Sequence, residues 1–145
     1  MDDLLIRKLK KEDTGDVSRI FVTIMKPKAS VDYIQIIEEQ MKKKESASFI
    51  AELAGKVVGF MICNIISGNF GLLEKSAWIV MFGVDPKFMG QGIGNRLAKE
   101  VFRVCAEKGI KSVRTSVRWD STDILSFFKN LGFDRSSFIN LEINL

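Results

Sequence analysis

The stretch that decides the fold is Val84-Asp85-Pro86-Lys87-Phe88-Met89-Gly90-Gln91-Gly92-Ile93-Gly94-Asn95-Arg96-Leu97. It follows the apolar run Trp78–Phe82, which is typical of a strand, and it precedes apolar residues at helical spacing from Ile93 to Cys105. Three alternate glycines therefore lie in a tight turn between a strand and the first turn of a helix. Glycine permits a positive φ and the close approach of another group. Because the first N–H groups of a helix lack partners within it and carry partial positive charge, the stretch predicts an anion-binding site, most often one for phosphate.

Two common phosphate loops do not fit this stretch. A P-loop requires Gly-Lys-Ser/Thr after its last glycine, whereas the chain has Gly94-Asn95-Arg96. The dinucleotide fingerprint Gly-x-Gly-x-x-Gly is also absent, because Gly90, Gly92 and Gly94 are each two residues apart. The alternative without a ligand is a tight glycine turn, but three small residues beside a helix start are more than a turn requires.

The stretch resembles the acetyl-CoA pyrophosphate loop of the GNAT acetyltransferase superfamily. The matching residues are Val84-Asp85-Pro86 after the strand and Gly92-Ile93-Gly94 before the helix, while Met89 stands where the family has Arg or Gln. The resemblance implies that backbone N–H groups across Gly90–Asn95 hold the pyrophosphate. It also implies a bulge in the preceding strand, at Phe82–Val84, that turns N–H groups toward the cofactor. The cofactor-binding residues expected in this way are Phe82, Gly83, Val84, Met89, Gly90, Gln91, Gly92, Ile93, Gly94, Asn95 and, from a second motif, Ser121 and Phe128.

That second motif is the segment from Asp120 to Phe133. Its Gly132-Phe133 pair matches the family well, but Ser121 replaces an Asn, and Phe128 replaces a Tyr that often protonates the departing CoA thiolate. Phenylalanine has no hydroxyl and cannot donate this proton. The structural alternative is that Phe128 is a packed aromatic of an amphipathic helix, and it is expected both to pack and to line the cofactor channel.

The composition indicates a soluble globular chain that forms one domain over residues 1–145. The chain has 46% hydrophobic and 28% charged residues, with a net charge of +4. Its basic residues are scattered, which favours a solvated surface of mixed sign over nucleic-acid binding. The small surplus of positive charge would also help to attract a polyanionic cofactor.

Several functional classes are disfavoured by what the sequence lacks. It contains no histidine, which removes His-based triads, His general bases and His metal ligands. The two cysteines, Cys63 and Cys105, have no zinc-site spacing and are expected to be buried thiols, so no metal is predicted. The start Met1-Asp2-Asp3 has no signal-like core and no segment approaches a membrane span, so we expect a cytoplasmic protein that does not bind membranes.

The pattern along the chain predicts the order β-α-α-β-β-β-α-β-α-β, with a further short strand after Gly132 as an option. Pro27 is expected to end the first helix and Ser30 to cap the second, and Ala54-Gly55 predicts a hairpin turn. This gives an α/β (α+β) fold with a mixed, mostly antiparallel sheet and helices on both faces, which is the order of the GNAT fold. The strands are expected over residues 4–10, 48–53, 56–66, 75–84, 113–119 and 138–145.

The general base is less clear than the cofactor loop. Ser116 stands where ribosomal-protein N-terminal acetyltransferases have a Glu, so the candidates are Glu74, before the strand that leads to the loop, and Asp120. Both also fit ordinary surface or capping roles. A water relay, or capture of an amine that is already neutral, would need no dedicated side chain.

The resemblance implies an N-acetyltransferase that moves an acetyl group from acetyl-CoA to a primary amine, either a small molecule or a protein N-terminus. The alternative is a non-catalytic CoA-binding sensor or regulatory module. Tyr33 is a candidate contact for the acceptor, and a partly buried structural tyrosine is the competing interpretation. The expected strand Phe138–Leu145 would leave a pairing edge open, so we also expect a homodimer that covers this edge.

Overall fold

A computed structural model of the chain describes residues 3–25, 33–43 and 45–145. The roles expected for Pro27 and Ser30 lie outside the described residues. The chain divides into two compact units, Met1–Thr115 and Ser116–Leu145.

The first unit is built on a five-stranded sheet in the order β1-β2-β3-β4-β5. The first four strands pair antiparallel, and β5 pairs parallel with β4. This confirms the mixed, mostly antiparallel sheet predicted from the sequence. The strands are β1 Leu4–Lys8, β2 Phe49–Leu53, β3 Lys56–Ile66, β4 Ser76–Val84 and β5 Val113–Arg114.

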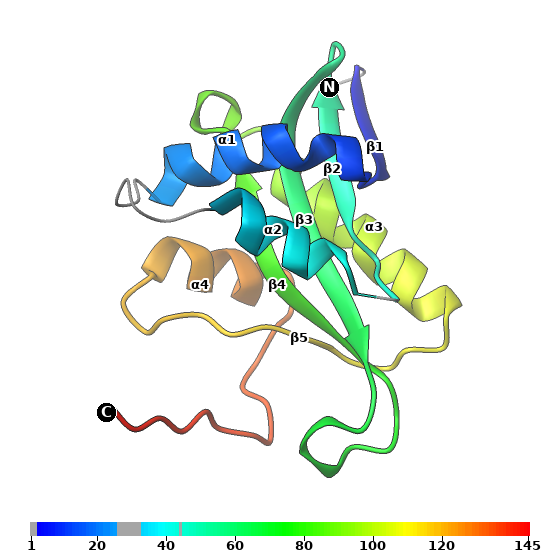
Figure 1. The fold of residues 1–145 in the computed structure, drawn as a ribbon, viewed down its shortest axis with the longest axis vertical. Helices are drawn as coiled ribbons and strands as arrows, with labels where there is room; N and C mark the ends of the chain where they lie inside the picture. Colours follow the sequence, from blue (N-terminus) through cyan, green and yellow to red (C-terminus); the bar gives the residue numbers. More distant parts are fainter. Residues whose placement is uncertain (1–2, 26–32, 44) are drawn as a thin grey trace. The chain divides into compact units, whose positions relative to one another are not determined.

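Helices cover both faces of this sheet, as predicted. Figure 1 shows α1 (Thr14–Met25) and α2 (Tyr33–Met41) in front of the sheet and α3 (Ile93–Glu107) behind it. The helix α3 faces the sheet with the apolar stripe that its sequence spacing predicts. On the other face, one apolar cluster joins α1, α2 and the central strands, because each amphipathic helix must bury its apolar side. The fully or nearly buried members of this cluster are Val17, Ile20, Ile37, Ile50, Val57, Phe60 and Ile62.

The hairpin between β2 and β3 turns at the predicted dipeptide. Both of its residues have positive φ, 51° at Ala54 and 81° at Gly55, which is the conformation of the two-residue turns that match strand twist. The pairing then runs from Lys56 along β3, where Gly59 lies opposite Val84. The start of β3 therefore lies beside the end of β4, where the glycine loop begins.

The second unit contains the helix α4 (Thr122–Asn130), but the terminal strand expected over residues 138–145 is not formed. Its alternating apolar residues are exposed, with fractions of 80% at Ile139, 86% at Leu141 and 81% at Ile143. The alternation shows which side chains share a face, but a strand also needs a neighbouring backbone, and residues 138–145 pair with no described strand. The expected homodimer relied on this strand edge, and it stays a prediction.

The strand β5 is also shorter than the expected span 113–119. Its ladder with β4 consists of Ala77 opposite Val113 and Trp78 opposite Arg114. The next contact is made by a side chain, because the hydroxyl of Thr115 donates to the carbonyl of Ile79 at 2.9 Å. The parallel ladder therefore ends before it reaches the second half of β4.

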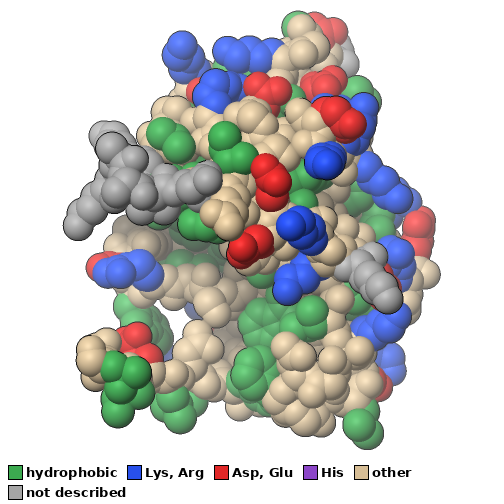
Figure 2. All heavy atoms as spheres, in the orientation of Figure 1, with side chains coloured by type: hydrophobic (Ala, Val, Ile, Leu, Met, Phe, Trp, Pro, Cys, Tyr) green, Lys and Arg blue, Asp and Glu red, His purple; other side chains and the backbone are tan. Residues whose placement is uncertain are grey.

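The surface carries charges of both signs. Figure 2 shows cationic and anionic side chains mixed over the face that α1 and α2 cover. Several of them form ion pairs, such as Arg19 with Asp16 on α1 at 3.7 Å.

Candidate functional site

The strand β4 carries a bulge, but not where it was expected. Ile62 lies opposite Met81 and Cys63 opposite Ile79, so Val80 has no opposite residue on β3. The expected bulge at Phe82–Val84 is therefore wrong, because pairing with β3 is regular there. No local signal in the sequence marks this position, since Val80 is an ordinary strand residue.

Gly83 instead permits close packing. It lies opposite Phe60, and a Cβ built on it would come within 2.8 Å of Ile24 Cδ1 and 2.9 Å of Phe60 Cε1. Real Cβ atoms are almost never this close to other heavy atoms. The absence of a side chain at Gly83 therefore lets α1 approach β4 next to the glycine loop.

The root of the loop is held by Asp85, a buried residue that was not among the predicted site residues. Its backbone N–H donates to the carbonyl of Val58 at 2.8 Å, and its carboxylate accepts the N–H of Lys87 at 3.0 Å. Burial disfavours the charged form, but the hydrogen bonds from Lys87 and Arg19 outweigh it and hold the pKa of Asp85 below its usual value. Asp85 therefore acts as an ionised cap for the short 3-10 helix η3, Pro86–Phe88.

The glycine turn that follows has the backbone conformation that the sequence predicts. Gly90 and Gly92 have positive φ, 79° and 76°, and a Cβ at either position would meet no atom within 4 Å. Gly92 is the N-cap of α3, and its carbonyl accepts the first helical hydrogen bond, from the N–H of Arg96 at 3.1 Å. The N–H groups of Ile93, Gly94 and Asn95 precede that bond and have no acceptor within the helix. The turn thus combines open space with helix N–H groups, which suits an anionic group.

Cationic residues lie on or beside this turn. Lys87 belongs to η3 and Arg96 to the first turn of α3, and the ammonium of Lys56 lies 5.8 Å from the centroid of the Phe88 ring. The predicted loop residues Met89 and Gln91 are exposed, Phe82 is half-buried, and Val84 and Ile93 are buried. These surroundings favour a polyanion at the turn.

The two candidate bases have different positions. Glu74 precedes the start of β4, and at about 3.3 Å per strand residue it is roughly 30 Å from the glycine loop at the other end of that strand. Its carboxylate lies 3.9 Å from the ammonium of Lys111. The structure therefore does not bring Glu74 to the loop.

Asp120 belongs to the second unit, where it is exposed and paired with Arg118. The guanidinium donates to both carboxylate oxygens at 2.9 Å, and this contact lowers the pKa of Asp120. A carboxylate with a lowered pKa is a weaker base, because it holds a proton less strongly.

The other predicted residues of the second unit lie on α4. Ser121 is the N-cap of this helix, but its hydroxyl makes no capping hydrogen bond. Phe128 is buried, and its ring meets Phe127 and Phe133 edge to face at centroid distances of 5.1 and 5.0 Å. The packing role expected for Phe128 is thus present within the unit, while its role toward a cofactor stays a prediction.

Tyr33, the predicted acceptor contact, begins α2. It is half-buried and its ring packs on Phe21 of α1 with a centroid distance of 5.2 Å. This contact gives Tyr33 a structural role, and its role toward an acceptor stays a prediction.

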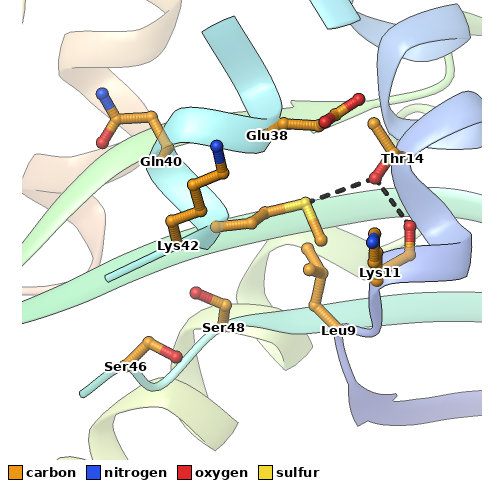
Figure 3. A pocket seen from close by; sticks show the side chains of 9 residues that line it. Leu9, Lys11, Thr14, Glu38, Gln40, Lys42, Ser46 and Ser48 are labelled. Atoms are coloured by element: carbon orange, nitrogen blue, oxygen red, sulfur yellow. Dashed lines mark hydrogen bonds between the residues drawn. The ribbon is translucent and has the colours of Figure 1, made fainter. Parts of the chain in front are cut away.

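A cavity of about 280 Å³ lies away from the glycine turn, between α2 and the starts of α1 and β2. The hydroxyl of Thr14 lies 3.6 Å from the Met41 sulfur and 2.7 Å from the carbonyl of Lys11, and Figure 3 marks both contacts with dashed lines. Its lining residues are Leu9, Lys11, Thr14, Glu38, Gln40, Met41, Lys42, Ser46 and Ser48. None of them was predicted as a site residue.

The described part of the chain offers neither a cluster of metal ligands nor a membrane-spanning helix. Over residues 3–25, 33–43 and 45–145, no group of three or more His, Cys, Asp or Glu side chains could hold a metal ion. Within the same ranges, no helix is both long enough and apolar enough to cross a membrane.

The chain is similar to known acetyltransferases in sequence. The sequence model of the acetyltransferase (GNAT) family matches residues 11–133. An uncharacterized N-acetyltransferase of Methanocaldococcus jannaschii is 34% identical over 103 residues, which cover 68% of this chain and 44% of that protein. The chain spans less than half the length of the curated relatives that it matches.

Solved structures share the fold. Ard1 from Thermoplasma volcanium has a TM-score of 0.79 and 27% identity, covering 93% of this chain and 85% of that one. An aminoglycoside acetyltransferase from an uncultured soil metagenomic sample has a TM-score of 0.81, covering 99% and 97% of the two chains. At 20% identity this second likeness shows the fold alone. Together they confirm the predicted fold.

Proposed function

The chain belongs to the acetyltransferase (GNAT) family, and we propose that it transfers an acetyl group from acetyl-CoA to a primary amine, either of a small molecule or of a protein N-terminus. The observation that carries the proposal is the glycine turn between β4 and α3. Gly90 and Gly92 hold positive φ in open space, and the N–H groups of Ile93–Asn95 have no acceptor within the helix.

The residues present fit the pyrophosphate of the cofactor. Side chains at Gly90 or Gly92 would occupy the space where phosphate oxygens would meet backbone N–H groups. Lys56, Lys87 and Arg96 would add attraction for the remaining negative charge. When bound, acetyl-CoA supplies a thioester whose carbonyl carbon accepts the amine.

In the proposed reaction the amine nitrogen forms a bond to that carbon and the carbon–sulfur bond breaks. The sulfur leaves as the CoA thiolate, and the nitrogen loses a proton. Such reactions depend mainly on orientation and on polarising the carbonyl. The ladder between β4 and β5 ends at Trp78. The second half of β4, which leads to the loop, therefore does not pair with β5.

We assign no side chain as general base. Glu74 is far from the loop, and the pKa of Asp120 is lowered by Arg118. If the amine is already neutral, or if water relays its proton, the reaction requires neither Glu74 nor Asp120 as a base. The leaving thiolate also needs no acid from Phe128, because a thiol has a pKa of about 8.5 and its anion leaves fairly well near neutral pH.

The family match runs over residues 11–133 and so crosses the boundary between the two compact units. This supports the proposal that residues 1–145 act as one acetyltransferase domain. Cofactor roles for Ser121 and Phe128 belong to this proposal, because both residues have places in the family motif.

The test measures release of free thiol from acetyl-CoA with a panel of amines. The panel includes aminoglycosides, because one structural neighbour is named as an aminoglycoside acetyltransferase, and peptides with free N-termini. Thiol release that requires an amine and forms its N-acetyl product would support the proposal. Binding of CoA without release from any amine would favour the non-catalytic sensor, and absence of CoA binding would overturn both.

A further inference from the structure

We propose that Arg19 of α1 is a positioning residue for the cofactor loop, acting through Asp85. This inference rests on the proposed function, since it assigns the loop to coenzyme A binding. The two residues are 66 positions apart in the sequence, and α1 contributes no residue to the glycine turn. Arg19 would therefore affect the cofactor without touching it.

The guanidinium of Arg19 joins three parts of the fold. One nitrogen, Nη1, donates to Asp85 Oδ2 at 3.2 Å, and the other, Nη2, donates to the carbonyl of Val57 at 3.0 Å. Val57 lies at the start of β3, and Asp85 directly follows β4. A single planar group thus fixes the loop root to the neighbouring strand and to α1.

Val57 and Val58 are available for these contacts because β3 is irregular here. In the pairing of β2 with β3, Ala51 lies opposite Gly59 and Glu52 opposite Val57, so Val58 has no opposite residue. The carbonyl of Val58 instead accepts the N–H of Asp85 at 2.8 Å. At this bulge two successive carbonyls therefore accept hydrogen bonds: that of Val58 from Asp85 and that of Val57 from Arg19.

Asp85 transmits the position of Arg19 to the loop. Its carboxylate has two oxygens: Oδ2 accepts from Arg19, and Oδ1 accepts the N–H of Lys87 within the loop. The carbonyl of Asp85 also accepts the N–H of Phe88 at 2.8 Å. A rotation of the carboxylate after loss of Arg19 would therefore move η3, and Gly90 follows only two residues after η3 ends.

The far end of the loop has its own support, because Ile93 and Leu97 of α3 are buried. Only the near end depends on Asp85 and its partners. The side chain of Arg19 is 41% exposed, so water can replace part of its pairing, whereas the Asp85 carboxylate is 8% exposed and would keep the N–H of Lys87. Loss of Arg19 should thus lower the unfolding temperature modestly and also raise the Kd for coenzyme A measured well below that temperature, which global destabilisation alone would not do.

The experiment measures the Kd for coenzyme A by calorimetry and the melting temperature of the free protein. The variants are Arg19→Gln, Arg19→Lys and, as matched control, Arg103→Gln, which removes an exposed arginine paired with Glu100 and Glu107 on α3. We expect Arg19→Gln to raise the Kd by about five- to tenfold, which is the size of one hydrogen bond of ordinary strength. Arg19→Lys keeps the charge but cannot donate through two nitrogens at once, so it should lose less affinity than Arg19→Gln. Arg103→Gln should bind coenzyme A as the unaltered chain does.

A double-mutant cycle tests whether Arg19 acts through Asp85. The variant Asp85→Asn keeps an acceptor for the N–H of Lys87 but loses the charge that Arg19 pairs with. If the two residues act together, combining Arg19→Gln with Asp85→Asn should weaken binding no more than Asp85→Asn alone.

The outcomes separate this inference from the proposed function. If the unaltered chain does not bind coenzyme A, the proposed function fails. If the unaltered chain binds but Arg19→Gln binds within twofold of it, or if the effects of the two substitutions add in the cycle, the positioning role is wrong. A loss of affinity shared equally by Arg103→Gln would also refute it, because the effect would then follow from net charge.

Discussion

A side chain at position 92 should block the cofactor cradle, the glycine turn Gly90–Asn95 that we assign to the pyrophosphate. Its effect on folding can be measured separately, as the melting temperature of the free protein. In the free protein, Gly92→Ala meets no atom within 4 Å, so the only penalty is the positive φ of 76°. The left-handed conformation costs a residue with a Cβ about 1–2 kcal/mol. At about 2.1 cal/mol/K per residue, a chain of 145 residues unfolds with an entropy of about 0.3 kcal/mol/K, so the melting temperature should fall by about 3–7 °C.

Gly55 supplies the matched control for this penalty. It lies in the β2–β3 hairpin, has a φ of 81°, and would also place a Cβ in open space. Gly55→Ala should therefore lower the melting temperature by a similar amount. The two variants should differ only in their response to coenzyme A.

That response is measured as the rise in melting temperature when coenzyme A is added. At a concentration of 100 times the Kd, a ligand that binds only the native state adds about 2.7 kcal/mol, or about 9 °C for this chain. If the methyl group of Gly92→Ala weakens binding by tenfold or more, the rise should shrink by at least about 4 °C. The Gly55→Ala variant should keep the full rise.

An acidic pair of variants sharpens the comparison. Gly92→Asp adds both bulk and negative charge to the cradle and should abolish the rise, whereas Gly55→Asp should not. If both Gly92 variants kept the full rise, the phosphates would not be held at this turn, and the assignment of the cradle would be refuted.

Two predictions concern stability. Arg7 lowers the pKa of the buried Asp13 carboxylate below its unfolded value of about 3.9. The ionised carboxylate therefore stabilises the fold above that pH, and this stability is lost as the pH falls through the lower folded pKa. Asp13→Asn should therefore reduce the free energy of unfolding by about 1–3 kcal/mol at pH 7, and denaturant titrations of the two proteins should converge in acid; a constant difference would contradict this. Gly83→Ala should lower the free energy of unfolding by about 1–3 kcal/mol, because its methyl group would clash with Ile24 and Phe60. Adding Ile24→Val removes the closest atom and should recover part of that free energy. Strictly additive losses in the double variant would show that Ile24 is not the obstacle.

The parts of the fold that follow from local signals could be predicted from the sequence. Ala54-Gly55 predicts its turn because few dipeptides adopt two positive φ angles, and the spacing of Ile93, Leu97 and Val101 defines the buried face of α3. The segment 138–145 has an equally clear alternation, but it is not a strand. Strand formation depends on a partner that the pattern itself does not contain.

The same division applies to the candidate site. The glycine turn could be predicted because its conformation is set by the residues that form it. The bulge at Val80 could not, since it results from the register between β3 and β4 and not from the residue type. Glu74 is the converse case: it is near β4 in the sequence, but an extended strand separates it from the loop.

Arg19 was missed because its contacts exist only after α1 has packed on the sheet. One signal was available in the sequence, since an Asp directly before Pro is typical of a cap, and the cap of a loop between a strand and a helix is expected to be buried.

A buried carboxylate needs a cationic or N–H partner. The N–H of Lys87 satisfies one oxygen, so a second donor had to come from elsewhere in the chain, and it had to be long enough to reach across the end of the sheet. An arginine on the helix that covers β3 and β4 meets both conditions, and its fork can also bind the strand carbonyl beside the loop. The requirement for a distant partner was thus predictable from Asp85, whereas its identity depended on the packing of α1.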